Sequence, residues 1–150
     1  MKRRRSLAQI EDTYGTIWRF DTARYTVACW AEEEDMDPRD SMQFDEDIEF
    51  ALEGDSHWFC ACVGVFKCDD NSADDWCDDD FECIGYDVLG GCSYRSYREF
   101  VSGHRQGGPA DRNCLATKAR NVVICHYFPD MVRQAVAEAR AHEIKLQFVA

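Results

Sequence analysis

The segment HWFCACVGVFKCDDNSADDWCDDDFECIGYDVLGGCSYRSYREF, from His57 to Phe100, decides the fold. In His57–Cys68 apolar residues occupy both alternating faces, which is the pattern of a central strand covered on both sides. An acidic excursion of fourteen residues follows, from Asp69 to Glu82. Phe81–Leu89 is the expected return strand, so the segment predicts two long antiparallel strands joined by an acidic loop.

The residues after this strand pair predict a turn, two helices and a further strand. The Gly90-Gly91 pair is expected to leave the return strand, and the capping-box pattern Ser96-x-x-Glu99 to open a short helix. A loop rich in glycine is expected at Gly103–Asn113. Another strand is predicted at Asn121–Tyr127, and Pro129 then suits the first position of a final helix. That helix would pack on the sheet through an apolar stripe, which comprises Met131, Val132, Ala135, Val136 and Ala139.

The residues before the central strand complete the expected fold. Two β-branched and aromatic runs, Thr16–Phe20 and Arg24–Trp30, predict an antiparallel hairpin. Ser41–Leu52 predicts a helix with Ser41 as its N-cap and with Phe44, Ile48, Ala51 and Leu52 as its apolar stripe. Residues 1–12 are polar and lack a period, so we expect a flexible basic arm before a single compact α+β domain at residues 13–150. The expected architecture is a mostly antiparallel sheet of about four to six strands, with about two or three helices packed on one side.

The net charge of −12 conceals an uneven distribution. Residues 31–82 contain twenty Asp and Glu against only Arg39 and Lys67, a formal charge of −18. The rest of the chain carries +6. A dense array of carboxylates can occupy Lys and Arg side chains that otherwise bind phosphates, so the acidic segment predicts a basic partner. The alternative is a solvated acidic surface without a partner.

Two parts of the acidic segment are candidate partner-binding sites. In the loop, Trp76 would serve as an aromatic anchor among carboxylates, or would fold back over the loop. The predicted helix at 41–52 presents the second set on its polar face. We expect the loop to contribute more because its charge density is higher. The candidates are Asp74, Asp75, Trp76, Asp78, Asp79, Asp80 and Glu82 in the loop, and Asp45, Glu46, Glu49 and Glu53 on or beside the helix.

The remaining patterns do not predict a cofactor, a metal site or a reaction. Calcium-loop spacing from Asp69 places Ala73 at a ligand position and Asp74 where the turn glycine is needed. The nine cysteines include no CxxC pair, which favours packing as small apolar side chains over zinc ligation. Cys125 and His126 would point to opposite faces of a strand and could not act together. We therefore expect no cofactor, no metal and no enzymatic activity.

Cysteine usage and hydropathy predict the compartment. The basic N-terminal residues are not followed by an apolar core typical of a secretory signal, and there is no apolar run of transmembrane length. An odd number of cysteines leaves at least one unpaired unless chains cross-link, and without a secretory signal we expect reduced thiols in a cytoplasm. We expect a protein of the host-cell cytoplasm that binds neither nucleic acid nor membrane directly. The oligomeric state stays open.

Two segments carry a resemblance to known proteins. They are DVLGGCSY at Asp87–Tyr94, followed by Glu99-Phe100, and YFPDMV at Tyr127–Val132, followed by Ala135 and Glu138-Ala139-Arg140. In these segments the chain resembles small uncharacterised accessory proteins of phages, prophages and mobile elements. The resemblance covers less than half of the chain and supplies no catalytic residues. It implies an accessory role in a phage genome.

The charge and this resemblance together predict a function. By analogy, small acidic phage proteins include inhibitors of host defence, such as anti-CRISPR and anti-restriction proteins, and some of these imitate DNA. The expected function is inhibition of a host nucleic-acid-binding defence complex by occupation of its positively charged surface. The alternative is a small metal-binding or structural accessory protein whose acidic surface is merely solvated.

Overall fold

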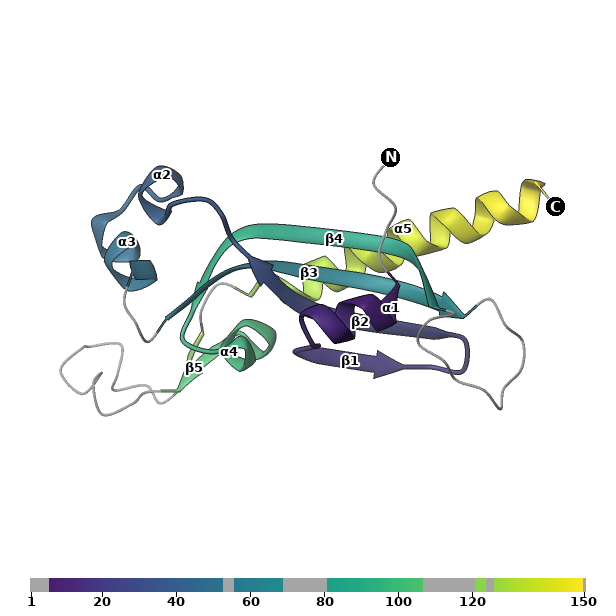
Figure 1. Ribbon diagram of the computed structural model, residues 1–150, viewed down its shortest axis with the longest axis horizontal. Coiled ribbons are helices and arrows are strands. Elements are labelled where there is room, and N and C mark those ends of the chain that lie inside the picture. The colour runs from purple at the N-terminus through teal and green to yellow at the C-terminus, as the bar shows by residue number, and fades with distance from the viewer. Residues whose placement is uncertain (1–5, 53–55, 69–80, 107–120, 124–125, 150) are drawn as a thin grey trace.

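The computed structural model describes residues 6–52, 56–68, 81–106, 121–123 and 126–149 (Figure 1). The fold is α+β and contains a four-stranded antiparallel sheet in the order β1-β2-β3-β4, with a second two-stranded sheet of β5 and β6. The strands are β1 (Trp18–Asp21), β2 (Tyr25–Glu33), β3 (His57–Cys68), β4 (Phe81–Tyr94), β5 (His104–Gln106) and β6 (Asn121–Val123). The helices are α1 (Leu7–Thr13), α2 (Pro38–Ser41), α3 (Asp45–Leu52), α4 (Tyr97–Ser102) and α5 (Phe128–Val149).

The central strand predicted from the sequence is confirmed. β3 spans His57–Cys68 and pairs with β2 on one side and β4 on the other. Its residues are apolar on both faces because each face carries a separate core. The β1–β2 hairpin is also confirmed, with Phe20 opposite Val27.

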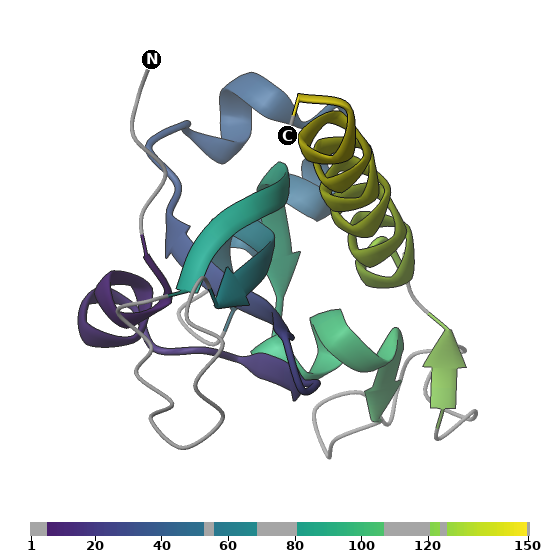
Figure 2. The same cartoon turned by 90° about the vertical axis from the view of Figure 1, so that its right-hand side faces the viewer.

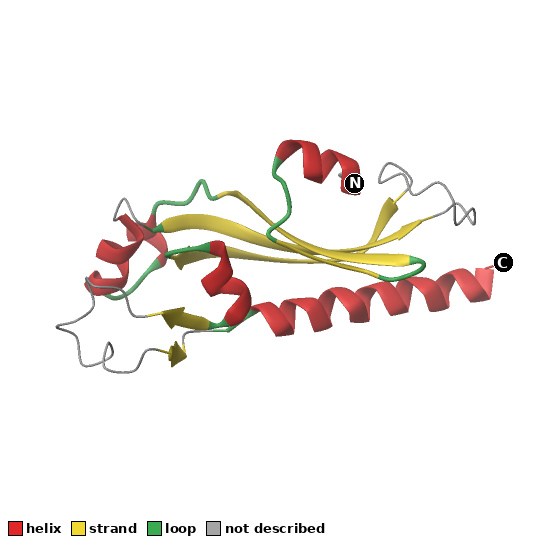
Figure 3. Cartoon of the chain, turned by 90° about the horizontal axis from the view of Figure 1, so that it is seen from below, coloured by secondary structure: helices red, strands yellow, loops and turns green. Residues whose placement is uncertain are grey.

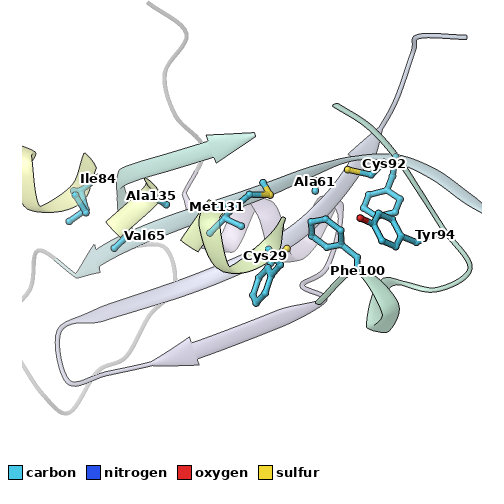
Figure 4. Packing of buried hydrophobic residues seen from close by; sticks show 13 residues of the cluster. Cys29, Ala61, Val65, Ile84, Cys92, Tyr94, Phe100, Met131 and Ala135 are labelled. Carbon is cyan, nitrogen blue, oxygen red and sulfur yellow. The ribbon is translucent and has the colours of Figure 1, made fainter. Parts of the chain in front are cut away.

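Helices cover both faces of the main sheet, so the prediction that they pack on one side is wrong. Figures 2 and 3 show α1 on one face and α5 on the other. The α5-side core consists of Cys29, Phe59, Ala61, Val63, Val65, Ile84, Cys92, Tyr94, Phe100, Phe128, Met131, Ala135 and Ala139, and part of it appears in Figure 4. The α1-side core consists of Leu7, Ile10, Ala28, Trp30, Cys62, Phe66 and Cys83.

The predicted apolar stripe of α5 is confirmed as its contact with the sheet. Met131, Ala135 and Ala139 are buried, and the helix lies against β4 at Gly85. A Cβ atom on Gly85 would come within 2.1 Å of the Ala135 carbonyl oxygen. The absence of a side chain at this position therefore sets how closely α5 approaches the sheet.

The N-terminal arm is a correction to the sequence analysis. Within the expected flexible region, α1 forms and buries Leu7 and Ile10 completely or nearly so, at 0% and 2% exposure. Ser6 begins the helix with a capping box: its hydroxyl accepts from the Gln9 N–H, and the Gln9 side chain accepts from the Ser6 N–H. Two apolar residues three apart suffice to hold so short a helix on the sheet. Residues 1–5 lie outside the described residues.

Two boundaries near the acidic segment also differ from the prediction. α3 begins at Asp45, and Ser41 is the last residue of a separate helix, α2, rather than an N-cap. β4 continues through Gly90 and Gly91 to Tyr94 instead of ending before them. The glycines form an irregularity within the strand. Phe59 pairs with Cys92 and Ala61 with Leu89, so the two glycines of β4 stand opposite the single residue Cys60 of β3.

The remaining elements agree in part with the sequence. Ser96 caps α4 by accepting from the Glu99 N–H, as the capping-box pattern predicts, although the Glu99 carboxylate accepts from the Arg95 N–H instead of that of Ser96. The loop expected from Gly103 onward begins with a short strand, β5. Its partner β6 ends at Val123, earlier than the predicted strand.

Candidate protein-interaction surface

The structure places the predicted contact residues in different parts of the molecule. Asp45, Glu46 and Glu49 are exposed on α3, and Glu82 is exposed near the start of β4. The other candidates lie outside the described residues: Glu53, Asp74, Asp75, Trp76, Asp78, Asp79 and Asp80. The loop prediction therefore stays a prediction, and the surface that can be described is the one that contains α3.

We define the acidic cap as residues 34–52, which follow β2 and include α2 and α3. This segment contains eight carboxylates and a single basic residue, Arg39, for a formal charge of −7. Figures 1 and 3 show α2 and α3 at the end of the main sheet where β3 begins. The carboxylates of the acidic cap are thus gathered at one end of the sheet rather than spread over a face.

Two hydrogen bonds fix the first part of the acidic cap to the sheet, one to β4 and one to β3, and a third lies within the cap itself. The Glu34 carboxylate accepts from the Gly91 backbone N–H at 2.7 Å and from the Met36 N–H at 3.2 Å. The Trp58 indole N–H of β3 donates to the Met36 carbonyl at 2.7 Å. Hydrogen bonds to an ionised carboxylate are stronger than those between neutral groups. Glu34 therefore ties the segment after β2 to the far strand β4, across β3.

The strand irregularity explains why Gly91 can take part. Phe59 pairs with Cys92 and Ala61 with Leu89, so an extra residue of β4 stands opposite Cys60. Gly91 has a φ of 66°, in the left-handed region that glycine adopts without steric cost. A Cβ atom on Gly90 would come within 2.9 Å of the Glu34 carboxylate. Both glycines are therefore needed where this carboxylate approaches the strand.

The helix α3 is held at its C-terminal end. Ser56 donates its hydroxyl to the carbonyl of Phe50 at 2.6 Å and to that of Ala51 at 3.2 Å, which satisfies acceptors that a helix end leaves open. Ala51 is buried, and the Arg95 guanidinium lies 5.9 Å from the centre of the Phe50 ring. The opposite end carries three acidic residues in its first turn, where the helix dipole favours them.

The acidic cap also exposes apolar side chains among its carboxylates. Phe44 is 68% exposed, Leu52 49% and Met36 42%. Sequence reasoning places Phe44, Ile48 and Leu52 in the buried stripe of the helix with Ala51, but of these four only Ala51 is buried. Phe44 immediately precedes Asp45, Glu46 and Asp47. That adjacency is the sequence signal by which this exposed aromatic could have been found.

The carboxylates of α3 have no cationic partner among the described residues. Within the part of the acidic cap that the structure describes, Asp37 lies 3.9 Å from Arg39, whereas Asp45, Glu46 and Glu49 form no ion pair. In water, two such charges about 7 Å apart repel by roughly 0.6 kcal/mol before salt screening. The acidic cap therefore stores repulsion that a basic partner would relieve.

Four cysteines of the main sheet, Cys29, Cys60, Cys62 and Cys92, are at least partly buried and poorly suited to nucleophilic chemistry. Burial raises the pKa of Cys29 to about 12 and that of Cys92 to about 12, and it also raises the pKa of the half-buried Cys60. Cys62 is buried, accepts a hydrogen bond from the Tyr86 hydroxyl at 3.5 Å, and also has a raised pKa because of burial. Since the thiolate is the reactive form, these thiols are poor nucleophiles near neutral pH.

The described residues contain neither a metal-binding cluster nor a membrane span. In the ranges that the structure covers, no group of three or more His, Cys, Asp or Glu has an arrangement that could hold a metal ion. None of the described helices is long and apolar enough to cross a bilayer. No protein-family model, curated protein or solved structure matches the chain. The geometry of the acidic cap, with exposed carboxylates around an exposed aromatic ring, suits contact with a basic protein surface.

Proposed function

We propose that the protein is a phage-type inhibitor of a host defence complex, in which the acidic cap occupies a positively charged surface that otherwise binds nucleic acid. The observation that carries the proposal is the set of exposed carboxylates on α3, which form no ion pair with any described residue, next to the exposed Phe44. Aromatic residues with low conformational entropy are frequent anchors of protein interfaces. The class of partner comes by analogy with small acidic phage proteins that inhibit host defence.

The scaffold of the acidic cap supports this role. Duplex DNA offers one negative charge per about 1.7 Å of its axis, and a helix presents carboxylates at fixed spacing along a pitch of about 5.4 Å. Asp45 and Glu49 are one turn apart on α3, with Glu46 beside them. Docking costs roughly 0.5 to 1.5 kcal/mol for each side chain that becomes ordered. Because Glu34 and Ser56 already hold the two ends of the segment, this ordering cost is smaller here.

The second candidate function is a structural accessory protein with a solvated acidic surface. The two functions differ in what they require of the exposed groups. A solvated surface needs charge alone, whereas a docking surface also uses Phe44 as a contact. Exposure of an aromatic ring at 68% within the acidic cap favours docking, because large exposed apolar groups tend to mark contact sites when they gather in one place.

The test is capture of a partner followed by competition with DNA. The protein is immobilised and exposed to host lysate at low and high salt, and a captured protein is then purified and tested for binding to labelled duplex DNA. We expect the protein to displace the DNA, and the Phe44→Ala variant to displace it at least about tenfold less effectively. The matched control is Phe20→Ala, since Phe20 is also exposed but lies in β1 outside the acidic cap.

Three results would contradict the proposal. A captured partner that binds the protein and DNA simultaneously would show that the acidic cap does not occupy the nucleic-acid site. Equal effects of Phe44→Ala and Phe20→Ala would show that the exposed ring beside α3 is no contact. Salt-independent capture would also count against a charge-driven contact.

A further inference from the structure

The outer edge of β4 is a second surface, separate from the acidic cap. β4 has fourteen residues and pairs with β3 on its inner side. In the described part of the chain no strand pairs with its outer side, which makes it the long edge of the main sheet (Figure 1). Such an edge presents backbone N–H and C=O groups to any extended segment that approaches it.

The contacts of Tyr86 show which backbone groups face outward. Its N–H donates to the Glu138 carboxylate of α5 at 3.4 Å, rather than to β3. Residues two apart in a strand direct their backbone groups to the same side, and the pairing is regular from Gly64–Tyr86 to Cys62–Val88. The N–H of Val88 therefore also faces outward. Its side chain is 49% exposed.

The charges along this edge select among possible occupants. β4 contains Glu82 and Asp87 and has no Lys or Arg, and Glu138 of α5 adds a third carboxylate beside the edge. A second copy pairing β4 with β4 would bring carboxylates toward carboxylates, which disfavours that arrangement. An extended segment with basic residues would meet the opposite charge. The Glu138 contact at 3.4 Å is longer than an ordinary N–H hydrogen bond, so an incoming carbonyl could replace it.

We infer that the outer edge of β4, from Tyr86 to Val88 and on toward Gly90, binds an extended basic segment of a partner protein as an added strand. Backbone hydrogen bonds to the outward groups of Tyr86 and Val88 provide the affinity. Basic side chains at alternate positions pair with Glu138 and Asp87 and provide the selectivity. This contact does not depend on the acidic cap and can hold whether or not the proposed inhibition does.

The test uses a fluorescent peptide, acetyl-(Lys-Thr)4-amide, and fluorescence anisotropy at physiological salt. Threonine favours strands, and lysine supplies the charge. We expect binding to the intact protein. The same peptide with every backbone nitrogen methylated keeps its charge but cannot donate backbone hydrogen bonds, and we expect it to bind at least about tenfold more weakly.

A pair of variants places the contact at the edge. Val88→Pro removes the outward N–H, which an edge strand tolerates because the ladder to the inner strand does not use it, and we expect at least about tenfold weaker binding. Val88→Thr retains the N–H and should bind like the parent.

Equal binding of the methylated peptide, or no binding of the parent peptide, would overturn the inference. If Val88→Pro fails to fold, the methylated peptide still decides. A parent dimer in sedimentation that is lost in Val88→Pro would also overturn it, since a second copy would then hold the edge.

Discussion

At the end of the main sheet where β3 begins, the carboxylates of α3 are exposed and have no cationic partner among the described residues. At the other end, Lys67 and Glu143 form an ion pair at 3.0 Å, and the Tyr25 hydroxyl donates to the same carboxylate at 3.2 Å. β3 spans twelve residues, so the two ends lie about 36 Å apart. At the first end the α3 carboxylates form no ion pair with any described residue. At the second end the contacts of Glu143 with Lys67 and Tyr25 join α5 to β3 and β2.

This difference separates charges that support the fold from charges that are available to a partner. The Lys67–Glu143 pair connects three elements distant in sequence and contributes to the placement of α5. Within the part of the chain that the structure describes, Asp45, Glu46 and Glu49 form no ion pair, and they repel one another, so removing these charges should cost little stability. Substitutions of the α3 carboxylates should therefore change partner binding, whereas substitutions in the Lys67–Glu143 pair should change stability.

The largest effect is expected where the acidic cap joins the sheet, at Glu34. Glu34→Ala leaves the Gly91 and Met36 N–H groups without their acceptor, and hydrogen bonds to charged groups typically stabilise by about 1.5 to 3 kcal/mol. We expect the free energy of unfolding to fall by about 2 kcal/mol in urea titrations. The control is Glu33→Ala, at the exposed neighbouring residue. Equal losses in the two variants would show that Glu34 does not anchor the acidic cap.

Neutralising α3 should have a large effect on binding and almost none on folding. For the triple variant Asp45→Asn, Glu46→Gln and Glu49→Gln we expect about tenfold weaker partner binding, about 1.4 kcal/mol, with a flatter salt dependence. The melting temperature should stay equal or rise slightly as repulsion is relieved. Calorimetric titration at two salt concentrations measures the first effect, and thermal unfolding the second.

The loop variant Asp78→Asn, Asp79→Asn and Asp80→Asn provides the matched comparison. These residues lie outside the described residues and join the two strand ends at the far end of the sheet. The sequence predicts a loss of at least about tenfold for them, larger than that for α3. If the loop variant loses affinity and the α3 variant does not, the contact belongs to the far end. If neither loses affinity, the acidic surface is only solvated.

A smaller effect is expected at the Lys67–Glu143 pair, and it depends on pH. The hydrogen bond from Lys67 lowers the pKa of Glu143 below its ordinary value of 4.5. A carboxyl group with a lowered pKa binds fewer protons in the folded state, so its contribution is present above about pH 4.5 and is lost as the pH falls through the folded pKa. Glu143→Gln should therefore flatten the decline of melting temperature in acid, and cost no more than about 1 kcal/mol at neutral pH.

The matched variant for that pair is Lys67→Met. It should flatten the acid decline less fully than Glu143→Gln does, because the Tyr25 hydroxyl still donates to the Glu143 carboxylate. The double variant should flatten it no further than Glu143→Gln alone, because that change already removes the contact with Lys67. Additive losses would show that the two side chains act separately. Lys67 and Glu143 would then contribute to stability independently and not as an ion pair.

The smallest effect is expected from reduction. Cys29, Cys60, Cys62 and Cys92 are free thiols, so reductant should leave the melting temperature unchanged. Thermal unfolding with and without a thiol reductant measures this. A fall on reduction would place a disulfide among the other cysteines, two of which, Cys68 and Cys77, border or lie within the predicted acidic loop.

The elements with unbroken patterns could be predicted from the sequence. β3 matches its predicted bounds because its residues are apolar on both faces over twelve positions. The stripe of α5 repeats through several turns and leaves little ambiguity. α1 was missed because two apolar residues give no visible period in a helix of seven residues. The Ser6-Leu-Ala-Gln9 capping box was the available signal.

The acidic cap could be predicted only in part. The carboxylates of α3 were identified, because a helix with one charged face is evident from spacing. Its anchoring could not be foreseen, since Glu34 and Gly91 are 57 positions apart and meet only through an irregularity in strand pairing. Phe44 was assigned to the core because sequence spacing does not reveal whether a helix at the end of a sheet has anything to pack against.

The contact between Glu34 and Gly91 has a consequence for how this sequence can diverge. One half of the contact is a backbone N–H, which every residue except proline possesses, and the other half is a specific side chain. Glycine at 91 is retained for its left-handed φ rather than for recognition. Among divergent chains that keep this fold, we therefore expect an acidic residue at position 34 to persist without any compensating exchange at position 91. Correlated substitutions would not reveal this contact.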